Sequence, residues 1–302
     1  MKSKVKIIVI SVLFVIVGVF FGIIAHVNSA GAKTMDFSGD TDETTDIIII
    51  DEDEIETIDS YTSKDVVKIS LGKVTTCNAF EVTTTGQSNA LTFGFTANVK
   101  VSNHRIIKNN EAFIECISES NIGIGTAGSQ RFFSGDNVCI RNTKTVQDLK
   151  PDYTDKETNV INQEQYKEKY GWLPYQMNGY IINDSTYLED PTIFDNGNDT
   201  YRINVKLDPT SDAAFYYKRE VATNAETTYE PIFKNIEMNI TIDSKFVIKE
   251  VKIHEEYQVT VDYGFLGKIT SDTTTETVDT YNYDNVSFDA DLYNYYKGKL
   301  SA

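Results

Sequence analysis

Apolar and polar residues alternate through most of the chain after residue 61. From residue 91 to residue 101 every odd position is apolar, and the even positions hold Thr, Gly, Asn and Lys. Successive side chains of a strand point to opposite faces of a sheet, so this segment is predicted to be a strand with one buried and one solvated face. Turn-forming residues at 109–110 and 134–136 separate further apolar runs. We therefore predict a meander of about five strands that starts near Phe80.

The same alternation returns in the C-terminal half of the chain, over residues 201–207, 236–242 and 247–261. The last of these segments is long enough to cross a large sheet. Residues 269–283 are much more polar and hold six threonines between Thr270 and Thr280. That composition is expected of an edge strand, or of a strand with one face left to solvent. Together these segments predict a second meander.

Helical patterns are few and short. Ser63 can cap a helix with apolar residues at positions 67, 71 and 74, and Asn162 can cap a helix over residues 163–170. The sequence at 208–212 can open a third helix, and a short segment at 288–296 can close the chain. Because strands outnumber helices and do not alternate with them one for one, the predicted fold class is α+β, mainly β. We expect a large curved antiparallel sheet or an incomplete barrel, with a few helices on one face, preceded by a single N-terminal transmembrane helix.

Residues 7–25 carry no charge and follow Lys2, Lys4 and Lys6. At about 1.5 Å per residue they span about 28 Å, close to the hydrocarbon thickness of a bilayer, whereas the apolar region of a cleaved signal peptide has about 7 to 15 residues. Residues 1–32 are therefore predicted to be a signal-anchor, with a cleaved signal peptide as the alternative. The lysines keep the N-terminus inside. The expected location is the cell membrane, single-pass, with the C-terminal domain outside, or secreted if the signal is cleaved.

Residues 36–59 carry eleven acidic residues and no basic one. Like charges repel one another along such a run, so residues 33–60 are predicted to be an acidic disordered spacer before an extracytoplasmic β-rich domain at residues 61–302. Deleting residues 36–59 is then expected to leave folding intact. The apolar tetrad Ile47–Ile50 is the exception, and two interpretations of it remain: an added strand, or an apolar run that is merely tolerated.

Composition narrows the classes of function. The formal net charge is -17, which repels a phosphate backbone, so no nucleic-acid partner is expected. Cys77, Cys116 and Cys139 match no zinc spacing and can form at most one disulfide. Residues 123–128 satisfy G-x-G-x-x-G but continue as a strand instead of a helix, which disfavours dinucleotide binding. We expect no catalytic residues, no metal site and no cofactor, and hence no enzyme.

The order of the predicted elements is a helix at 63–74, a meander at 80–141, a strand at 201–207, a turn and helix from residue 208, and long strands to residue 283. This order resembles the LolA/LppX-type lipoprotein-carrier fold. The resemblance rests on element order and alternation, with no diagnostic motif. It implies an incomplete antiparallel barrel that curls around helices and encloses an apolar cavity for acyl chains. No cysteine lies near the N-terminal segment for lipid attachment, and no site residue can be transferred.

Two hypotheses of function follow. The first is a membrane-tethered extracytoplasmic domain, attached through residues 7–25, that binds a lipid or other hydrophobic ligand without catalysis. The residues expected to line its cavity are Leu91, Phe93, Phe95, Val99, Ile236, Met238, Ile240, Val251, Ile253 and Val259. A solid core built from the same side chains is the alternative to a cavity. The second hypothesis is a cell-surface adhesion or protein-interaction domain without a ligand cavity, whose outer face, rich in Thr and Tyr, contacts a partner.

Protease added to intact cells that carry the full chain should degrade residues 33–302, because the predicted anchor leaves them outside the membrane. Immunoblotting for the C-terminal region measures this, and a cytoplasmic protein of the same cells is the control for lysis. A fully protected domain would contradict the orientation. A released product that starts near Gly31 would show a cleaved signal peptide.

Overall fold

In the computed structural model of the chain, the described residues are 41–92, 95–121, 126–154, 158–171, 173, 179–225, 227–262 and 268–301. The predicted anchor at residues 7–25 lies outside them, as do the first residues of the predicted spacer. Within the described residues, no helix is both long and apolar enough to cross a membrane.

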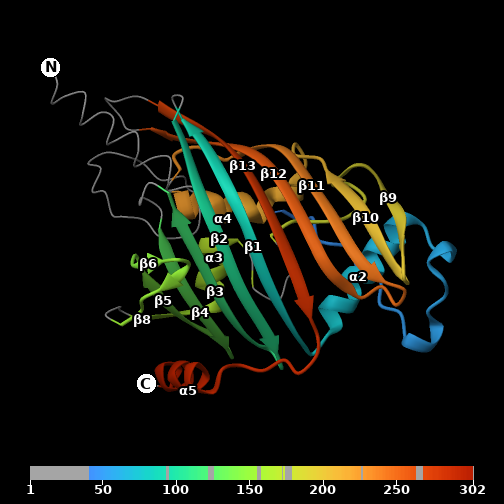
Figure 1. Ribbon diagram of the computed structural model, residues 1–302, viewed down its shortest axis with the longest axis horizontal. Coiled ribbons are helices and arrows are strands. Elements are labelled where there is room, and N and C mark those ends of the chain that lie inside the picture. Colours follow the sequence, from blue (N-terminus) through green and yellow to red (C-terminus); the bar gives the residue numbers. More distant parts are fainter. Residues whose placement is uncertain are drawn as a thin grey trace.

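One curved antiparallel sheet of 11 strands dominates the described part of the chain (Figure 1). The strands follow the order β8-β5-β4-β3-β2-β1-β13-β12-β11-β10-β9 across the sheet. Their bounds are β1 (Ala79–Thr92), β2 (Phe95–Lys108), β3 (Glu111–Ser120), β4 (Ala127–Ser134), β5 (Asn137–Thr143), β8 (Thr158–Asn162), β9 (Tyr187–Gly197), β10 (Thr200–Leu207), β11 (Ile232–Asp243), β12 (Ile248–Asp262) and β13 (Lys268–Asn282). Two short strands, β6 (Val146–Gln147) and β7 (Lys150–Pro151), pair with each other. The prediction of a large curved antiparallel sheet is confirmed.

The two meanders meet where β1 pairs with β13. Val82 lies opposite Tyr281, and the pairing continues as far as Leu91 and Asp272. Strand β13 is therefore central, with β8 and β9 at the edges of the sheet, and the interpretation of residues 269–283 as an edge strand is wrong. The other interpretation, a strand with one face left to solvent, agrees with the structure, because the outward-facing residues of this strand, such as Thr280, are exposed.

The strand predicted over residues 91–101 is in fact two strands. Strand β1 ends at Thr92 and β2 begins at Phe95, and these two residues pair across a hairpin. Alternation continues through the turn, so the apolar pattern does not mark it. The turn nevertheless changes which positions face inward, since Ala90 is buried in β1 and Ala97 in β2, whereas Leu91 is 47% exposed on the opposite face.

Helices lie on both faces of the sheet, which corrects the expectation of helices on one face. The inner face is covered by α2 (Ser63–Thr76), α3 (Gln163–Tyr170) and α4 (Phe215–Ala225), and the last helix, α5 (Ala290–Leu300), packs on the outer face (Figure 1). Short 3-10 turns occur at Glu52–Glu54, Ile58–Ser60 and Asp212–Ala214. Buried apolar residues of the inner face and of α2 and α4 form the main core cluster.

Local side chains set the ends of these helices. Thr62, one residue before the predicted cap, forms a capping box with Asp65 at the start of α2. Asn162 and Gln165 form the same arrangement at α3, as the sequence indicated for Asn162. Gly171 ends α3 at φ 88°, a left-handed conformation that glycine adopts without steric cost.

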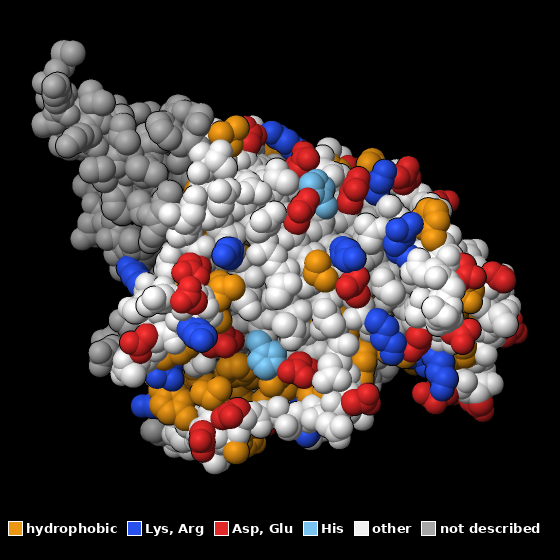
Figure 2. All heavy atoms as spheres, in the orientation of Figure 1, with side chains coloured by type: hydrophobic (Ala, Val, Ile, Leu, Met, Phe, Trp, Pro, Cys, Tyr) orange, Lys and Arg blue, Asp and Glu red, His pale blue; other side chains and the backbone are white. Residues whose placement is uncertain are grey.

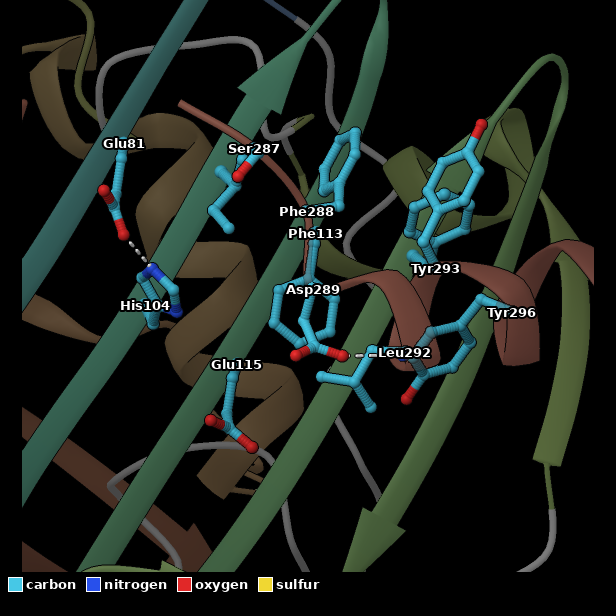
Figure 3. Close-up of a pocket in the computed structure, with 12 residues that line it drawn as sticks. Glu81, His104, Phe113, Glu115, Ser287, Phe288, Asp289, Leu292, Tyr293 and Tyr296 are labelled. Carbon is cyan, nitrogen blue, oxygen red and sulfur yellow. Dashed lines mark hydrogen bonds and ion pairs between the residues drawn. The ribbon is translucent and has the colours of Figure 1, made fainter. Parts of the chain in front are cut away.

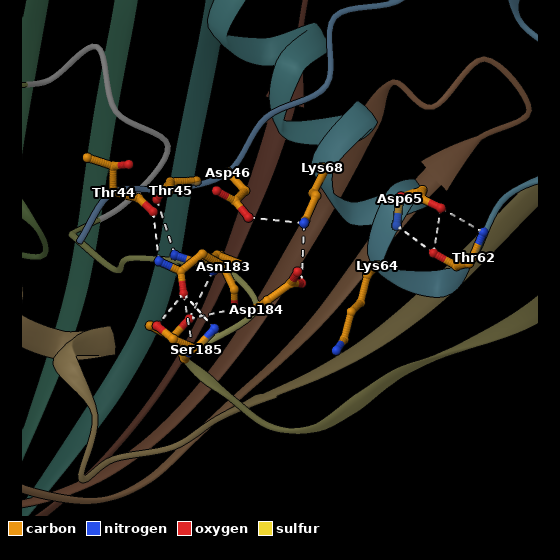
Figure 4. A network of polar contacts seen from close by, with 12 residues as sticks. Thr44, Thr45, Asp46, Thr62, Lys64, Asp65, Lys68, Asn183, Asp184 and Ser185 are labelled. Carbon is orange, nitrogen blue, oxygen red and sulfur yellow. Dashed lines mark hydrogen bonds and ion pairs between the residues drawn. The ribbon is translucent and has the colours of Figure 1, made fainter. Parts of the chain in front are cut away.

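Residues 41–50, which we call the strap, lie along α2 and the loop around residue 182 (Figure 4). The backbone N–H of Ile48 donates to the carbonyl of Lys68 (3.0 Å), and the N–H of Asp46 donates to the carbonyl of Ile182 (2.9 Å). Ile48 packs against the core cluster, whereas Ile49 is 66% exposed. The apolar tetrad is thus an extended segment with one face buried, and it does not join the sheet.

Two acidic side chains of the strap, Glu43 and Asp46, have partners in the folded domain. Asp46 pairs with Lys68 (3.0 Å), which also pairs with Asp184 (3.2 Å). The side-chain amide of Asn183 donates to Glu43 (2.6 Å). These contacts offset the like-charge repulsion on which the disordered-spacer prediction rested. Residues 41–50 thus lie against the folded domain, whereas residues 51–57 are mostly exposed, and the spacer stays a prediction for the rest of the segment.

Gly72 of α2 lies directly beneath the strap, and a Cβ there would come within 2.2 Å of the carbonyl oxygen of Ile48. Replacing a helical glycine by alanine ordinarily stabilises a protein by about 1 kcal/mol. We expect the opposite from Gly72→Ala, a lower thermal midpoint, because the strap backbone must move away. Thermal unfolding followed by circular dichroism measures this.

The matched control is Gly298→Ala in α5, where an added Cβ meets nothing within 4 Å and the midpoint should stay or rise. In a chain that lacks residues 41–50, Gly72→Ala should become stabilising. Equal gains from Gly72→Ala and Gly298→Ala in the full chain would show that the strap does not rest on α2.

Candidate functional site

The residues predicted to line a cavity fall into three groups. Seven are buried on the inner face, within the main core cluster: Val99, Ile236, Met238, Ile240, Val251, Ile253 and Val259. Leu91 is exposed on the outer face and forms no part of this wall. Phe93 and the side chain of Phe95 lie outside the described residues. Contact between the seven buried residues and a ligand stays a prediction.

Polar side chains occupy the centre of the inner face, between Val99 and the apolar residues of β12. The hydroxyl of Thr84 donates to the carboxylate of Asp279 (2.7 Å), and the hydroxyls of Ser88 and Thr275 are bonded to each other (2.8 Å). Both contacts cross from β1 to β13. Strands β1 and β13 therefore separate Val99 on β2 from the other buried residues of the predicted lining, which lie on β11 and β12.

Glu255 of β12 is a buried carboxylate beside this polar centre, with 4% of its surface exposed. It accepts hydrogen bonds from the hydroxyls of Tyr180 (2.6 Å) and Tyr217 of α4 (3.3 Å). Burial raises the pKa of Glu255 to about 7, and the charges of Asp279 and Glu220 act in the same direction, while the two tyrosine hydrogen bonds lower it. The side chain of Glu255 therefore connects the inner-face cover to the sheet, and its burial favours the protonated form.

An apolar row crosses the outer face of four strands. Its members pair in register from β2 to β5 and are all buried: Ile106, Phe113, Phe132 and Cys139. A polar row flanks it on each side, with His104, Glu115 and Gln130 in one and Lys108, Glu111 and Ser134 in the other. An apolar row of this length requires a cover on the outer face.

Helix α5 and the segment before it provide that cover. The ring of Tyr296 stacks on Phe132 with centroids 5.6 Å apart, and Phe288 and Tyr293 meet the same ring edge-on. The hydroxyl of Tyr296 donates to Gln130 (2.7 Å), which lies in the polar row. Aromatic pairs of this geometry stabilise the packing beyond the contribution of the apolar area that they bury.

A pocket of about 330 Å³ remains between α5 and the outer face. In Figure 2 hydrophobic side chains gather beside α5, whereas the rest of this face carries mainly polar and charged groups. The apolar lining is formed by Ile106, Phe113, Phe132, Phe288, Leu292, Tyr293 and Tyr296. The polar lining is formed by Glu81, His104, Glu115, Ser287 and Asp289. Figure 3 shows how these residues converge from β1, β2, β3 and α5.

Glu81 and His104 form a pair at one side of the pocket (Figure 3). The side-chain amide of Asn282 donates to the second oxygen of Glu81 (3.1 Å). The hydrogen bonds from Asn282 and His104 lower the pKa of Glu81. The His104 ring also lies edge-on to Phe113, with centroids 6.4 Å apart, so this polar pair borders the apolar wall.

Two further carboxylates line the pocket. Glu115 accepts a hydrogen bond from the amide of Gln130 (2.8 Å). Asp289 is the N-cap of α5 and accepts from the backbone N–H groups of Asp291 and Leu292, each at 3.0 Å. In the described part of the chain, no lysine or arginine lines the pocket.

Ser287 and His104 both line the pocket, but within the described residues no hydrogen bond joins them, and Nε2 of His104 is bound to Glu81. A nucleophile and its base need hydrogen-bond contact. The described residues also contain no group of His, Cys, Asp and Glu side chains arranged to hold a metal ion. The arrangement is best suited to holding an apolar body with a polar head.

No cavity on the outer face was predicted, although the sequence contains a signal for it. Neighbouring apolar residues in one strand point to opposite faces, so consecutive pairs indicate burial on both faces. Such pairs occur at 106–107, 113–114, 132–133 and 138–139, in four strands that lie side by side. The predicted helix at 288–296, found as α5, is the remaining element needed to cover them.

No protein-family model matches the chain, and no curated protein matches it either. Among solved structures, it is similar to an outer membrane lipoprotein-sorting protein domain from Vibrio parahaemolyticus, at 9% identity and a TM-score of 0.28 over 79% of this chain and 98% of that one. It is also similar to a DUF1329 family protein from Desulfovibrio piger, at 10% identity and a TM-score of 0.23 over 78% of this chain and 95% of that one. The resemblance indicated by the element order is thus found among solved structures. No residue role is taken from either protein.

Replacing Glu255 by glutamine should remove a pH dependence of stability. The folded-state pKa of Glu255 is about 7, above its ordinary value of 4.5, so its stabilising neutral form is fully present below pH 4.5 and is lost as the pH rises through 7. We expect Glu255→Gln to match the parent near pH 4.5 and to be about 3 kcal/mol more stable than the parent at pH 8. Urea unfolding at a series of pH values measures this. Glu256→Gln, on the exposed face of the same strand, is the control, and a parallel pH profile for parent and Glu255→Gln would contradict the assignment.

Proposed function

We propose that this chain is a non-enzymatic binding protein that holds a small hydrophobic molecule in the pocket between α5 and the outer face of the sheet. The pocket itself carries the proposal. Small-molecule sites are concave and mostly apolar, with a few polar groups that orient the ligand, and they occupy about 300–1,000 Å³. At about 330 Å³ this pocket fits a ligand at the small end of that range.

The attachment of α5 supports the proposal, because polar contacts hold the cover along one edge of the pocket. The ammonium of Lys108 donates to the carbonyl of Val286 (2.8 Å), and Lys297 pairs with Glu111 (3.0 Å). Both contacts lie on the side away from the Glu81–His104 pair, since Lys108 and Glu111 belong to the other flanking row. These two contacts hold the cover at the row that lies away from the Glu81–His104 pair.

The proposed setting is extracytoplasmic, with residues 7–25 as the membrane tether. The support for it is the uncharged segment behind three lysines in the sequence. A binding protein fits the geometry of the polar groups better than a hydrolase does. Ser287 and His104 lack the contact that nucleophilic catalysis needs, and each carboxylate of the pocket already accepts a hydrogen bond.

Leu292→Trp tests the pocket, because Leu292 lines it from α5 and a larger ring takes up the space of the ligand. We expect the dissociation constant of a neutral aromatic probe, para-fluorobenzyl alcohol, to rise by about tenfold or more. Fluorine NMR titration of the full chain in lipid nanodiscs measures this, with empty nanodiscs as the reference for partitioning into lipid. Leu188→Trp is the control, because Leu188 is exposed on β9, far from α5 in the sheet order.

Unchanged probe binding by Leu292→Trp, at the thermal midpoint of the parent, would overturn the proposed site. Loss of binding in Met238→Trp but not in Leu292→Trp would place the ligand on the inner face. Failure of the parent chain to bind the probe would leave the pocket without a ligand of this class.

A further inference from the structure

We infer that the ligand of this pocket carries a positive charge, as an ammonium or similar organic cation, next to its apolar body. This inference rests on the proposed function and names the class of ligand for the same site. It depends on the charges that line the pocket, on the hydrogen-bond partners of each carboxylate there, and on the aromatic rings beside the carboxylates.

Three carboxylates reach the pocket from three separate elements. Glu81 comes from β1, Glu115 from β3, and Asp289 from the start of α5 (Figure 3). Their meeting is a product of the tertiary fold, because the β1–β2 and β2–β3 pairings and the packing of α5 are all needed to bring them together. Among the described residues that line the pocket there is no lysine or arginine, and His104 is the one basic side chain.

Glu115 is the carboxylate best placed to bind a ligand cation. Glu81 is already bound by His104 and Asn282, and Asp289 is bound by two backbone N–H groups of α5. Glu115 accepts from the neutral amide of Gln130, and within the described residues it forms no ion pair. A cationic ligand group supplies the charge-assisted hydrogen bond that the protein itself does not provide there.

The aromatic wall favours the same class of ligand. The face of an aromatic ring is electronegative and attracts an ammonium within about 6 Å of its centroid. Tyr293 already interacts in this way with a cation of the protein, since the ammonium of Lys297 lies 5.9 Å from its centroid. Phe132 and Tyr296 cover one face of each other by stacking, and Phe113 adds a further ring to the lining.

An anionic ligand is disfavoured by the same features. Three carboxylates repel it at close range, and the net charge of -17 repels it at longer range. The N-terminus of α5 does not compensate, because Asp289 already accepts from the two N–H groups that an anion would use. Fatty-acid carboxylates are thus poor candidates for this site.

Three matched probes test the inference on the full chain in nanodiscs: para-fluorobenzylammonium, para-fluorobenzyl alcohol and para-fluorobenzoate, titrated by fluorine NMR at pH 7.5. We expect the ammonium to bind about tenfold more tightly than the alcohol, and the carboxylate to bind most weakly. In Glu115→Gln the ammonium should lose this advantage while the affinity for the alcohol is kept. Glu276→Gln removes the same charge from the outer face of β13, outside the pocket, and should keep the preference.

Equal affinities of the parent chain for ammonium and alcohol would overturn the inference and leave the proposed function standing. Tighter binding of the carboxylate would overturn it as well. Binding of none of the three probes would defeat the proposed function itself. The comparison of probes on the parent chain decides the question even if Glu115→Gln does not fold.

Discussion

Strand β1 pairs with β13 over 11 residue pairs, from Glu81 and Asn282 to Leu91 and Asp272. These backbone hydrogen bonds join two meanders that lie far apart in the sequence into one sheet. They also set the register of both faces, because each pair fixes which side chains point inward. The end of β13 then lies beside the start of β1, where Asn282 donates to Glu81 (3.1 Å). The chain leaves the sheet at this point and reaches the outer face as α5, so the position of the pocket follows from a pairing in the middle of the sheet.

Much of this fold could be predicted from local patterns. Alternation identified the strands of both meanders, and Asn162 and the 288–296 segment marked helices that the structure contains. The hairpin between Thr92 and Phe95 could not be found in this way, because the apolar period is the same on both sides of the turn. Leu91 was assigned to the wrong face for that reason.

The pocket was harder to predict than the sheet, because it depends on which strands lie next to one another. Phe113 and Phe132 are each one member of an apolar pair in their own strand, and only the strand order places them in one row. The strap posed a similar problem. Its acidic residues indicate a solvated run when counted by charge alone, yet Lys68 and Asn183 supply partners from segments distant in the sequence. The repulsion between charges within a segment can be counted from the sequence, but the contacts that offset it depend on the tertiary fold.

The position of α5 in the sequence, after the strands that it covers, has a consequence for biosynthesis. The floor of the pocket is formed by strands β1 to β4, and its other wall by residues 287–296. A ribosome completes the floor long before it reaches the wall, and chains generally fold in the direction of synthesis. Until the last helix emerges and docks, the row from Ile106 to Phe132 faces water and is open to chaperones or to other unfinished chains. The pocket is therefore completed only after residues 287–296 have been synthesised, well after the strands that form its floor.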